Sequence, residues 1–292
     1  MSSINEPKER DSTFYDSPYL AEHYDIFCEK YLTEELKDVP VYWEQLQKIQ
    51  SSAPEQPFVV LDVGTGTGRI LHGLAASAGE EGYDLSSAEF IGLEPSQDML
   101  DRAAKSSQMA HVGHVAWEQG TALDLVSVPS LNGCTKKVSM LMWAVGSISH
   151  LHEPEQPTQF LNQVAKVLMA GTGRVIISIS HHLAPKDLKD AAIAPWKNPP
   201  RLASRTFPDI VYQTTQLETK TIGHVQHDTR EVLVIRTLPE GTEQVVEKNL
   251  VQFKGRLWKE NELVDTAKNA GLELADTISA EREAFYIFKL QE

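Results

Sequence analysis

Cysteine is scarce in this chain of 292 residues, which holds only Cys28 and Cys134. The two lie far apart and without metal-ligand spacing, so a disulfide framework is excluded and a single bridge is not expected. No apolar stretch approaches the roughly 20 residues that span a bilayer, and Met1–Asp16 lacks the hydrophobic segment of a signal peptide. From these absences we expect a cytoplasmic protein with no membrane partner.

Positive charge is also in short supply. The chain has 27 Lys and Arg against 41 Asp and Glu, a formal net charge of −14. A groove for nucleic acid needs clustered basic side chains to neutralise phosphates, and no such run occurs. Nucleic acids are therefore excluded as expected partners.

Metal-ligand patterns are missing as well. Eight of the ten histidines come in close pairs, but no spacing supplies a third ligand. The pairs are His111 with His114, His150 with His152, His181 with His182, and His224 with His227. The sequence therefore predicts no metal site.

Short apolar runs alternate with helical patterns in the middle of the chain. The strands are expected at 58–63, 90–93, 112–117, 138–145 and 174–180, and the helices at 69–78, 96–104 and 159–168. Such alternation is typical of βαβ units, which build a parallel sheet with right-handed crossovers.

The flanking regions have a different texture. Met1–Arg10 is polar and is predicted to be disordered, and two amphipathic stretches follow at 14–31 and 42–49. Alternating segments at 210–221, 231–237 and 243–253 predict a small antiparallel sheet. A helix at 259–270 and a hairpin of 272–278 with 284–290 close the chain. We expect a helical lid over 1–55, a core of 56–183 and 257–292, and a β insert over 184–256.

One segment carries most of the chemical information. An apolar run ends in Asp62, and Gly64, Gly66 and Gly68 follow before a helical pattern begins. Glycines at a strand end permit positive φ and let a ligand approach the backbone closely. The spacing differs from the dinucleotide fingerprint G-x-G-x-x-G, and no Lys-Ser or Lys-Thr follows as in a P-loop. The segment predicts a ligand loop of another kind.

A second signal lies one βαβ unit further on. The strand expected at 90–93 ends in Glu94. A carboxylate at a strand tip can accept two hydrogen bonds from a ribose diol. The glycine loop and Glu94 together predict an adenosine ligand.

From about Phe14 to the C-terminus, the chain resembles the class I S-adenosylmethionine-dependent methyltransferases. This resemblance implies a Rossmann-like, doubly wound, mostly parallel seven-stranded α/β sheet with a C-terminal antiparallel hairpin. It implies that the glycine loop holds the methionine end of S-adenosylmethionine, that Glu94 binds the ribose and that Met99 packs on adenine. The cofactor-binding residues implied are Tyr19, Tyr24, Asp62, Gly64, Thr65, Gly66, Gly68, Arg69, Glu94, Pro95, Met99, Gly120, Thr121, Ala122, Trp143 and Ala144.

Some of these positions have plainer interpretations. Thr121 stands where the family usually has an acidic residue near the adenine amino group. Arg69 is either a ligand of the methionine carboxylate or a solvent-facing residue of the first helical turn. Tyr19 and Tyr24 either cover the cofactor or anchor a helix in the core.

The predicted reaction is methyl transfer to an oxygen or nitrogen of a small-molecule metabolite, with the lid and the insert forming the acceptor pocket. A hydroxyl acceptor needs a general base, for which His150 and His152 are the candidates, whereas a neutral amine needs none. Two alternatives stay open. The chain could catalyse a cyclisation or isomerisation on the same scaffold, or it could be a non-catalytic cofactor-binding partner.

Overall fold

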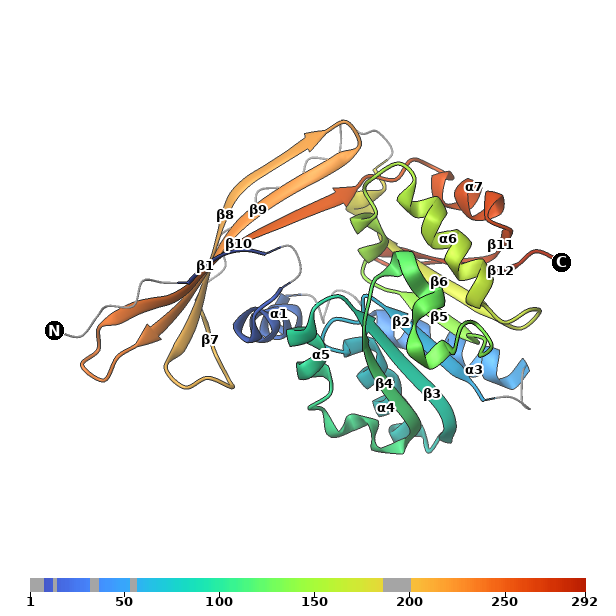
Figure 1. Ribbon diagram of the computed structural model, residues 1–292, viewed down its shortest axis with the longest axis horizontal. Helices are drawn as coiled ribbons and strands as arrows, with labels where there is room; N and C mark the ends of the chain where they lie inside the picture. The colour runs from blue at the N-terminus through green and yellow to red at the C-terminus, as the bar shows by residue number, and fades with distance from the viewer. Residues whose placement is uncertain (1–7, 13–14, 32–36, 53–56, 186–200) are drawn as a thin grey trace.

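A seven-stranded sheet flanked by helices forms the body of the protein (Figure 1). The computed structural model describes residues 8–12, 15–31, 37–52, 57–185 and 201–292. The elements of this body are α3 (Asp38–Ser52), β2 (Val59–Val63), α4 (Arg69–Glu81), β3 (Leu85–Glu94), α5 (Gln97–Ala103), β4 (Val112–Gln119), β5 (Met140–Trp143), α6 (Gln156–Val167), β6 (Arg174–Ser180), α7 (Glu262–Asn269), β11 (Leu272–Ser279) and β12 (Glu283–Leu290). Short 3₁₀ helices are η1 (Ser107–His111), η2 (Ala122–Ser127), η3 (Pro129–Leu131), η4 (Ser147–His150) and η5 (His181–Leu183).

The strand order is β11-β12-β6-β5-β2-β3-β4. Strands β2 to β6 pair in parallel, and β12 runs antiparallel to both of its neighbours. Every residue of the central strands β2 and β5 is buried, as expected of strands covered on both faces. The predicted α/β fold with a C-terminal hairpin is confirmed. The strand expected at 90–93 is longer than predicted, because β3 begins at Leu85.

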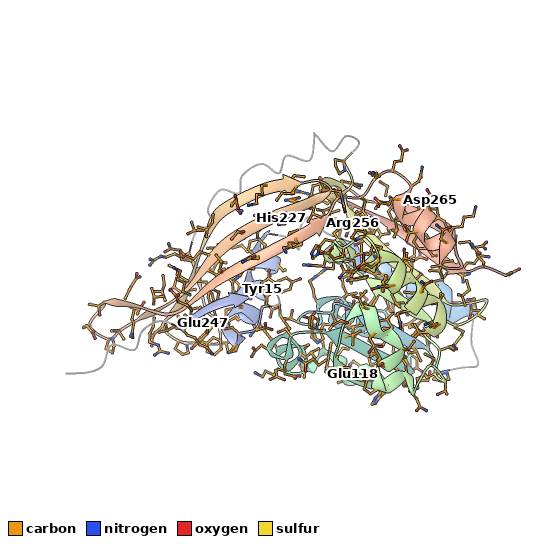
Figure 2. The ribbon with its side chains drawn as sticks, turned by 45° about the horizontal axis from the view of Figure 1, so that its top comes forward. Tyr15, Glu118, His227, Glu247, Arg256 and Asp265 are labelled. Atoms are coloured by element: carbon orange, nitrogen blue, oxygen red, sulfur yellow. The ribbon has the colours of Figure 1, made fainter. Side chains whose placement is uncertain are left out.

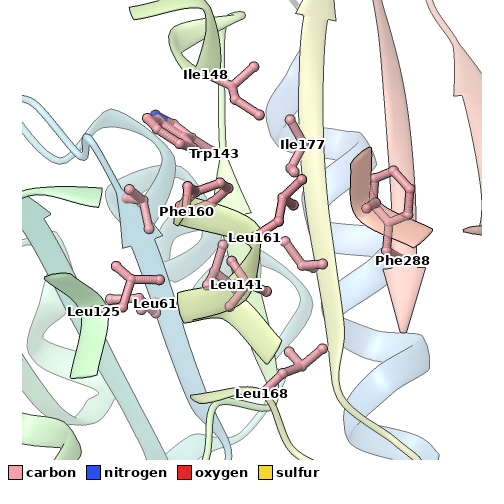
Figure 3. Close-up of a cluster of buried hydrophobic side chains, with 14 of the residues drawn as sticks. Leu61, Leu125, Leu141, Trp143, Ile148, Phe160, Leu161, Leu168, Ile177 and Phe288 are labelled. Atoms are coloured by element: carbon pink, nitrogen blue, oxygen red, sulfur yellow. The ribbon is translucent and has the colours of Figure 1, made fainter. Parts of the chain in front are cut away.

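Two hydrophobic clusters hold the helices against the two faces of this sheet. One contains α6, α7 and the apolar residues of η2 and η3, and Figure 3 shows its centre around Leu141, Phe160 and Leu161. The other lies under α3 and α4 and includes Tyr42 and Leu74. The order of the strands places the carboxyl ends of β2, β3 and β5 together at one edge, where ligands bind in folds of this kind.

A second sheet arches over that edge (Figure 1). It consists of β7 (Leu202–Ala203), β8 (Ile210–Ile222), β9 (Val225–Thr237), β10 (Glu243–Arg256) and β1 (Lys8–Ser12), in the order β1-β10-β9-β8-β7. The predicted antiparallel strands are present, with β9 beginning earlier than expected. The prediction that Met1–Arg10 is disordered is wrong for residues 8–10, because β1 pairs in parallel with β10 from Lys8↔Glu247 to Ser12↔Val251.

Helix α1 (Pro18–Tyr31) lies beneath this insert sheet and is fastened to it by a buried carboxylate. Glu22 accepts hydrogen bonds from the Tyr212 hydroxyl at 2.6 Å and from the backbone N–H of Thr206 at 2.7 Å. Burial alone would raise the pKa of Glu22, but bonds from Ser204, Tyr212 and Thr206 lower it to about 2. The helix and the sheet are therefore one packed unit. Within the described residues, no helix is both long and apolar enough to cross a bilayer.

Candidate cofactor and acceptor site

The glycine loop between β2 and α4 opens the backbone to a ligand. Gly64, Gly66 and Gly68 all have positive φ, of 64°, 58° and 81°. Gly64 is exposed, and a Cβ placed on it would lie 3.1 Å from Nε1 of Trp143. A side chain at Gly64 would therefore fill the approach between the loop and the end of β5. The loop is shaped for close contact with a bound molecule.

Two buried side chains fix this loop from within. The Thr65 hydroxyl donates a 2.7 Å hydrogen bond to Oδ2 of Asp62, and the backbone N–H of Thr65 donates to the carbonyl of Leu93 at 3.1 Å. Burial raises the pKa of Asp62 to about 7, although the Thr65 bond and the Arg69 charge oppose the rise. Asp62 and Thr65 thus act inside the loop, as supports of its backbone.

Glu94 lies at the tip of β3, as predicted. Its carboxylate accepts a bond from the backbone N–H of Gly66 at 3.1 Å and another from Ser96 at 3.1 Å. Burial raises the pKa of Glu94, while these two bonds favour its ionised form. A carboxylate offers about four lone-pair positions, so Glu94 keeps acceptor capacity for a diol.

The tips of β3 and β4 are joined beside Glu94. The Gly120 N–H donates to the Glu94 carbonyl at 3.2 Å, and Gln119 donates to the carbonyl of Pro95 at 2.9 Å. Met99 is 3% exposed, Thr121 is exposed and Ala122 is half-buried at the start of η2. The structure thus brings Pro95 and Gly120 to one end of the predicted ligand position, next to Glu94.

Helices α1 and α3 are tied to the glycine loop by carboxylates that the sequence did not reveal. Asp25 of α1 accepts from the Thr67 hydroxyl at 2.5 Å and pairs with Arg102. Asp38 of α3, which is 2% exposed, binds both terminal nitrogens of Arg69 at 2.8 and 2.6 Å. Arg69 is therefore a paired residue that joins two helices, and a contact with a methionine carboxylate stays a prediction.

Aromatic side chains of the N-terminal segment lie over the loop. Tyr24 is 3.7 Å from the position of a Cβ on Gly66, and its ring packs edge-on against Tyr15 at 5.4 Å between centroids. Figure 2 shows Tyr15 on the side of the insert sheet that faces the core. Tyr19 instead packs on Phe207 of the insert at 4.7 Å. The structure brings Tyr24 to the loop and places Tyr19 with the insert.

The end of β5 makes a tight turn beside Gly64. Trp143 is 4% exposed and packs against Phe160 with ring centroids 4.4 Å apart. After Ala144, both Val145 and Gly146 have positive φ, of 57° and 66°. Positive φ is a genuine outlier for a β-branched residue, and such strain clusters at functional sites. The turn carries the chain from the predicted methionine position directly into η4.

The two candidate bases differ in their surroundings. Although part of His150 is exposed, its ring packs against Phe253 with centroids 4.9 Å apart, and desolvation by the surrounding protein lowers its pKa to about 4. The ring of His152 lies against its own segment: Nδ1 is 2.9 Å from the His150 carbonyl oxygen, and Nε2 is 3.4 Å from a carboxylate oxygen of Glu153. His150 therefore has the more available ring.

Comparison with known proteins assigns the chain to a family. The family described as a methyltransferase domain matches residues 55–248. The chain is 30% identical over 272 residues to the N-methyltransferase FrzE of Cladobotryum sp, and the match covers 92% of this chain and 93% of that protein. The chain belongs to the class I S-adenosylmethionine-dependent methyltransferases.

Two solved structures have the same fold. An S-adenosylmethionine-dependent methyltransferase from Clostridium acetobutylicum matches with a TM-score of 0.64 and 13% identity, over 92% of this chain and 98% of that one. The sugar N-methyltransferase KedS8 from Streptoalloteichus sp matches with a TM-score of 0.61 and 16% identity, over 92% and 93%. The predicted enzyme class and the predicted cofactor, S-adenosylmethionine, are confirmed.

The site also contains residues that the sequence did not single out. Tyr15, Asp25 and Asp38 meet the glycine loop or its ligand side from segments far away in the chain. Phe253 of the insert contacts His150. None belongs to a local motif, and only the arrangement of the two sheets brings them together.

Proposed function

We propose that this enzyme methylates the nitrogen of a small-molecule amine. The observation that carries the proposal is the packing of the His150 ring against Phe253 in surroundings that lower its pKa, because a weakly basic ring is poorly suited to removing a proton from a hydroxyl group. The match to an N-methyltransferase over nearly the whole chain supports the same choice.

The low pKa of His150 favours an amine over a hydroxyl group as the acceptor. A ring with a pKa of about 4 is neutral at physiological pH, and it holds an added proton less tightly than an ordinary histidine. General-base catalysis is most effective when the pKa lies near the working pH. A neutral amine already has its lone pair, so it needs no such base, and His150 can still accept a hydrogen bond from its N–H.

We expect groups on three elements to hold the cofactor. Glu94 would bind the ribose, the loop from Gly64 to Gly68 would face the methionine end, and Trp143 would wall the space beside it. S-adenosylmethionine supplies a methyl group already activated on a sulfonium. The protein therefore mainly orients the amine and excludes water, an effect worth up to about 7–11 kcal/mol in the best intramolecular cases.

The N-terminal helix and the insert sheet would cover the bound pair. Asp25 anchors α1 to the loop through Thr67, and Glu22 anchors the same helix to the insert. The acceptor would then lie between the insert sheet and the ends of β2 and β5. The N–CH₃ bond would form as the S–CH₃ bond of the sulfonium breaks, which would leave S-adenosylhomocysteine, and the amine proton would be released to water.

The test is the identity of the product. The purified enzyme is incubated with S-adenosylmethionine and a panel of primary and secondary amines, each matched with the alcohol of the same skeleton. Mass spectrometry is expected to show N-methyl products together with S-adenosylhomocysteine. Preferred methylation of the alcohols would overturn the proposal, as would the absence of S-adenosylhomocysteine with every amine.

The control links turnover to the site. Glu94→Ala should weaken S-adenosylhomocysteine binding at least about 10-fold in calorimetry, because hydrogen bonds to charged groups contribute about 1.5–3 kcal/mol each. Glu260→Ala, which changes an exposed carboxylate before α7, should leave binding unchanged.

A further inference from the structure

The inner face of β9 changes from apolar to polar as the strand approaches the core. Val232 and Val234 belong to the apolar clusters that include Leu20 and Ile26 of α1. Arg230, Asp228 and Gln226 continue the same face, because side chains alternate between the two faces of a strand. We refer to these three residues as the polar stripe.

Gln226 is the unusual member of the polar stripe. Its side chain is 1% exposed, and neither Nε2 nor Oε1 has a hydrogen-bond partner among the residues that the structure describes. An unpaired buried polar group destabilises the folded state, because it has lost its hydrogen bonds to water without replacement. Buried polar groups in native proteins are nearly always paired, so an amide with both atoms free calls for a partner that binds from outside.

The position of Gln226 points to the acceptor. Its register partner on β10 is Gly255, and a Cβ on Gly255 would lie 2.6 Å from the Phe253 ring. The Phe253 ring contacts His150 at 4.9 Å between centroids. His150 ends η4, which follows the turn after Trp143 and Ala144. Gln226 therefore shares its surroundings with the residues next to the reacting end of the cofactor site.

Asp228 contributes a buried negative charge to the polar stripe. It is 4% exposed, accepts from Gln216 and from the Thr219 hydroxyl at 2.9 Å, and pairs with Arg230. Its negative charge is thus balanced within the protein. A carboxylate that is already paired with a cation raises the pKa of a nearby amine less than an unpaired carboxylate would, so the amine more readily stays neutral and reactive.

We propose that Gln226 positions the acceptor by binding a hydroxyl group of the same molecule that carries the reacting amine. A hydroxyl both donates and accepts, so one group can bind both atoms of an amide that has no other partner among the described residues. The acceptor class is therefore an amino alcohol, its hydroxyl on Gln226 and its nitrogen toward the cofactor. This assignment rests on the proposed N-methylation and specifies its substrate.

The experiment compares each amino alcohol with its deoxy amine. Wild type should have the higher kcat/KM for the amino alcohol, by about 3- to 10-fold, which corresponds to one hydrogen bond of about 0.5–1.5 kcal/mol. Gln226→Leu should remove this preference and leave kcat/KM for the deoxy amine unchanged. Gln252→Leu, the same change on the neighbouring strand and the opposite face, should preserve the preference.

A second measurement separates positioning from a structural role. Because Gln226 has no hydrogen-bond partner within the described part of the chain, Gln226→Leu should keep or raise the Tm and leave S-adenosylhomocysteine affinity unchanged. A Tm lowered by several degrees, or equal kcat/KM values for the two substrates in wild type, would overturn the assignment. If no amine is methylated, the proposed N-methylation is rejected, but the role of Gln226 can still be tested. Calorimetry then measures the affinity of amino alcohols and of deoxy amines for the S-adenosylhomocysteine complex. The proposed role of Gln226 is rejected if the amino alcohols bind no better than the deoxy amines.

Discussion

Replacing Glu283 by glutamine should stabilise the protein at alkaline pH and have little effect at acid pH. Glu283 begins β12, is 0% exposed, and has no hydrogen-bond partner on either oxygen within the described part of the chain. Burial, assisted by the charge of Asp38, raises its pKa to about 7, against an opposing influence of Ser178 and Arg69. The ionised form is therefore disfavoured in the folded state.

The size and sign of the effect follow from linkage. A pKa of about 7 in the folded state, against 4.5 in the unfolded state, corresponds to about 3 kcal/mol. Below pH 4.5 both states hold the proton and nothing is lost. Between pH 4.5 and 7 only the folded state holds it, so stability falls as pH rises. Above pH 7 the full cost is present.

Urea unfolding at pH 5 and pH 8 measures this difference. Glu283→Gln should gain about 2–3 kcal/mol over wild type at pH 8 and less than about 1 kcal/mol at pH 5. Glu281→Gln, an exposed change two residues earlier, should show no such pH dependence. The reasoning is refuted if the gain from Glu283→Gln is the same at both pH values or is larger at pH 5.

Two other predictions concern the loop and the reaction. Gly66→Ala forces an L side chain into φ 58° and should lower the free energy of unfolding in urea by about 1–2 kcal/mol. Gly79→Ala lies inside α4, where an added Cβ would have only His111 nearby, at 3.9 Å, so this control should be neutral or stabilising. Equal effects of the two substitutions would contradict the argument from backbone conformation. The kcat/KM for an amine acceptor should rise with pH up to the pKa of that amine, because His150 stays neutral down to about pH 4. A break near pH 6.5 that disappears in His150→Gln would show instead that this histidine is the base.

The parts of the fold that the sequence predicted are those with a local pattern. Strand β2 is a short apolar run, and the glycine loop and Glu94 lie at strand ends where the spacing alone points to an adenosine ligand. Strand β1 had no such pattern: Lys8–Ser12 is polar and charged, and only its distant partner β10 makes it a strand. Propensity within a short window carries no information about such pairing.

The same limit applies to the site. Arg69 was correctly placed at the start of a helix, but its partner Asp38 comes from a different element, so a ligand and a structural ion pair could not be told apart. Tyr15 and Gln226 were invisible for the same reason. Whether a polar side chain is buried without a hydrogen-bond partner depends on the folded chain, and neither its residue type nor its spacing in the sequence predicts it.

The pairing of β1 with β10 has a consequence for how the enzyme is made. Strand β1 leaves the ribosome before β10, which does not begin until Glu243, after the whole glycine-loop half of the core has been synthesised. Domains tend to fold as they emerge, whereas contacts between distant segments must first close a long loop. The segment that carries Tyr15 and Tyr24 can therefore reach its final place only after β10 has been synthesised. An emerging chain would have its cofactor loop before it has the cover, and methyl transfer would be delayed until β10 has emerged.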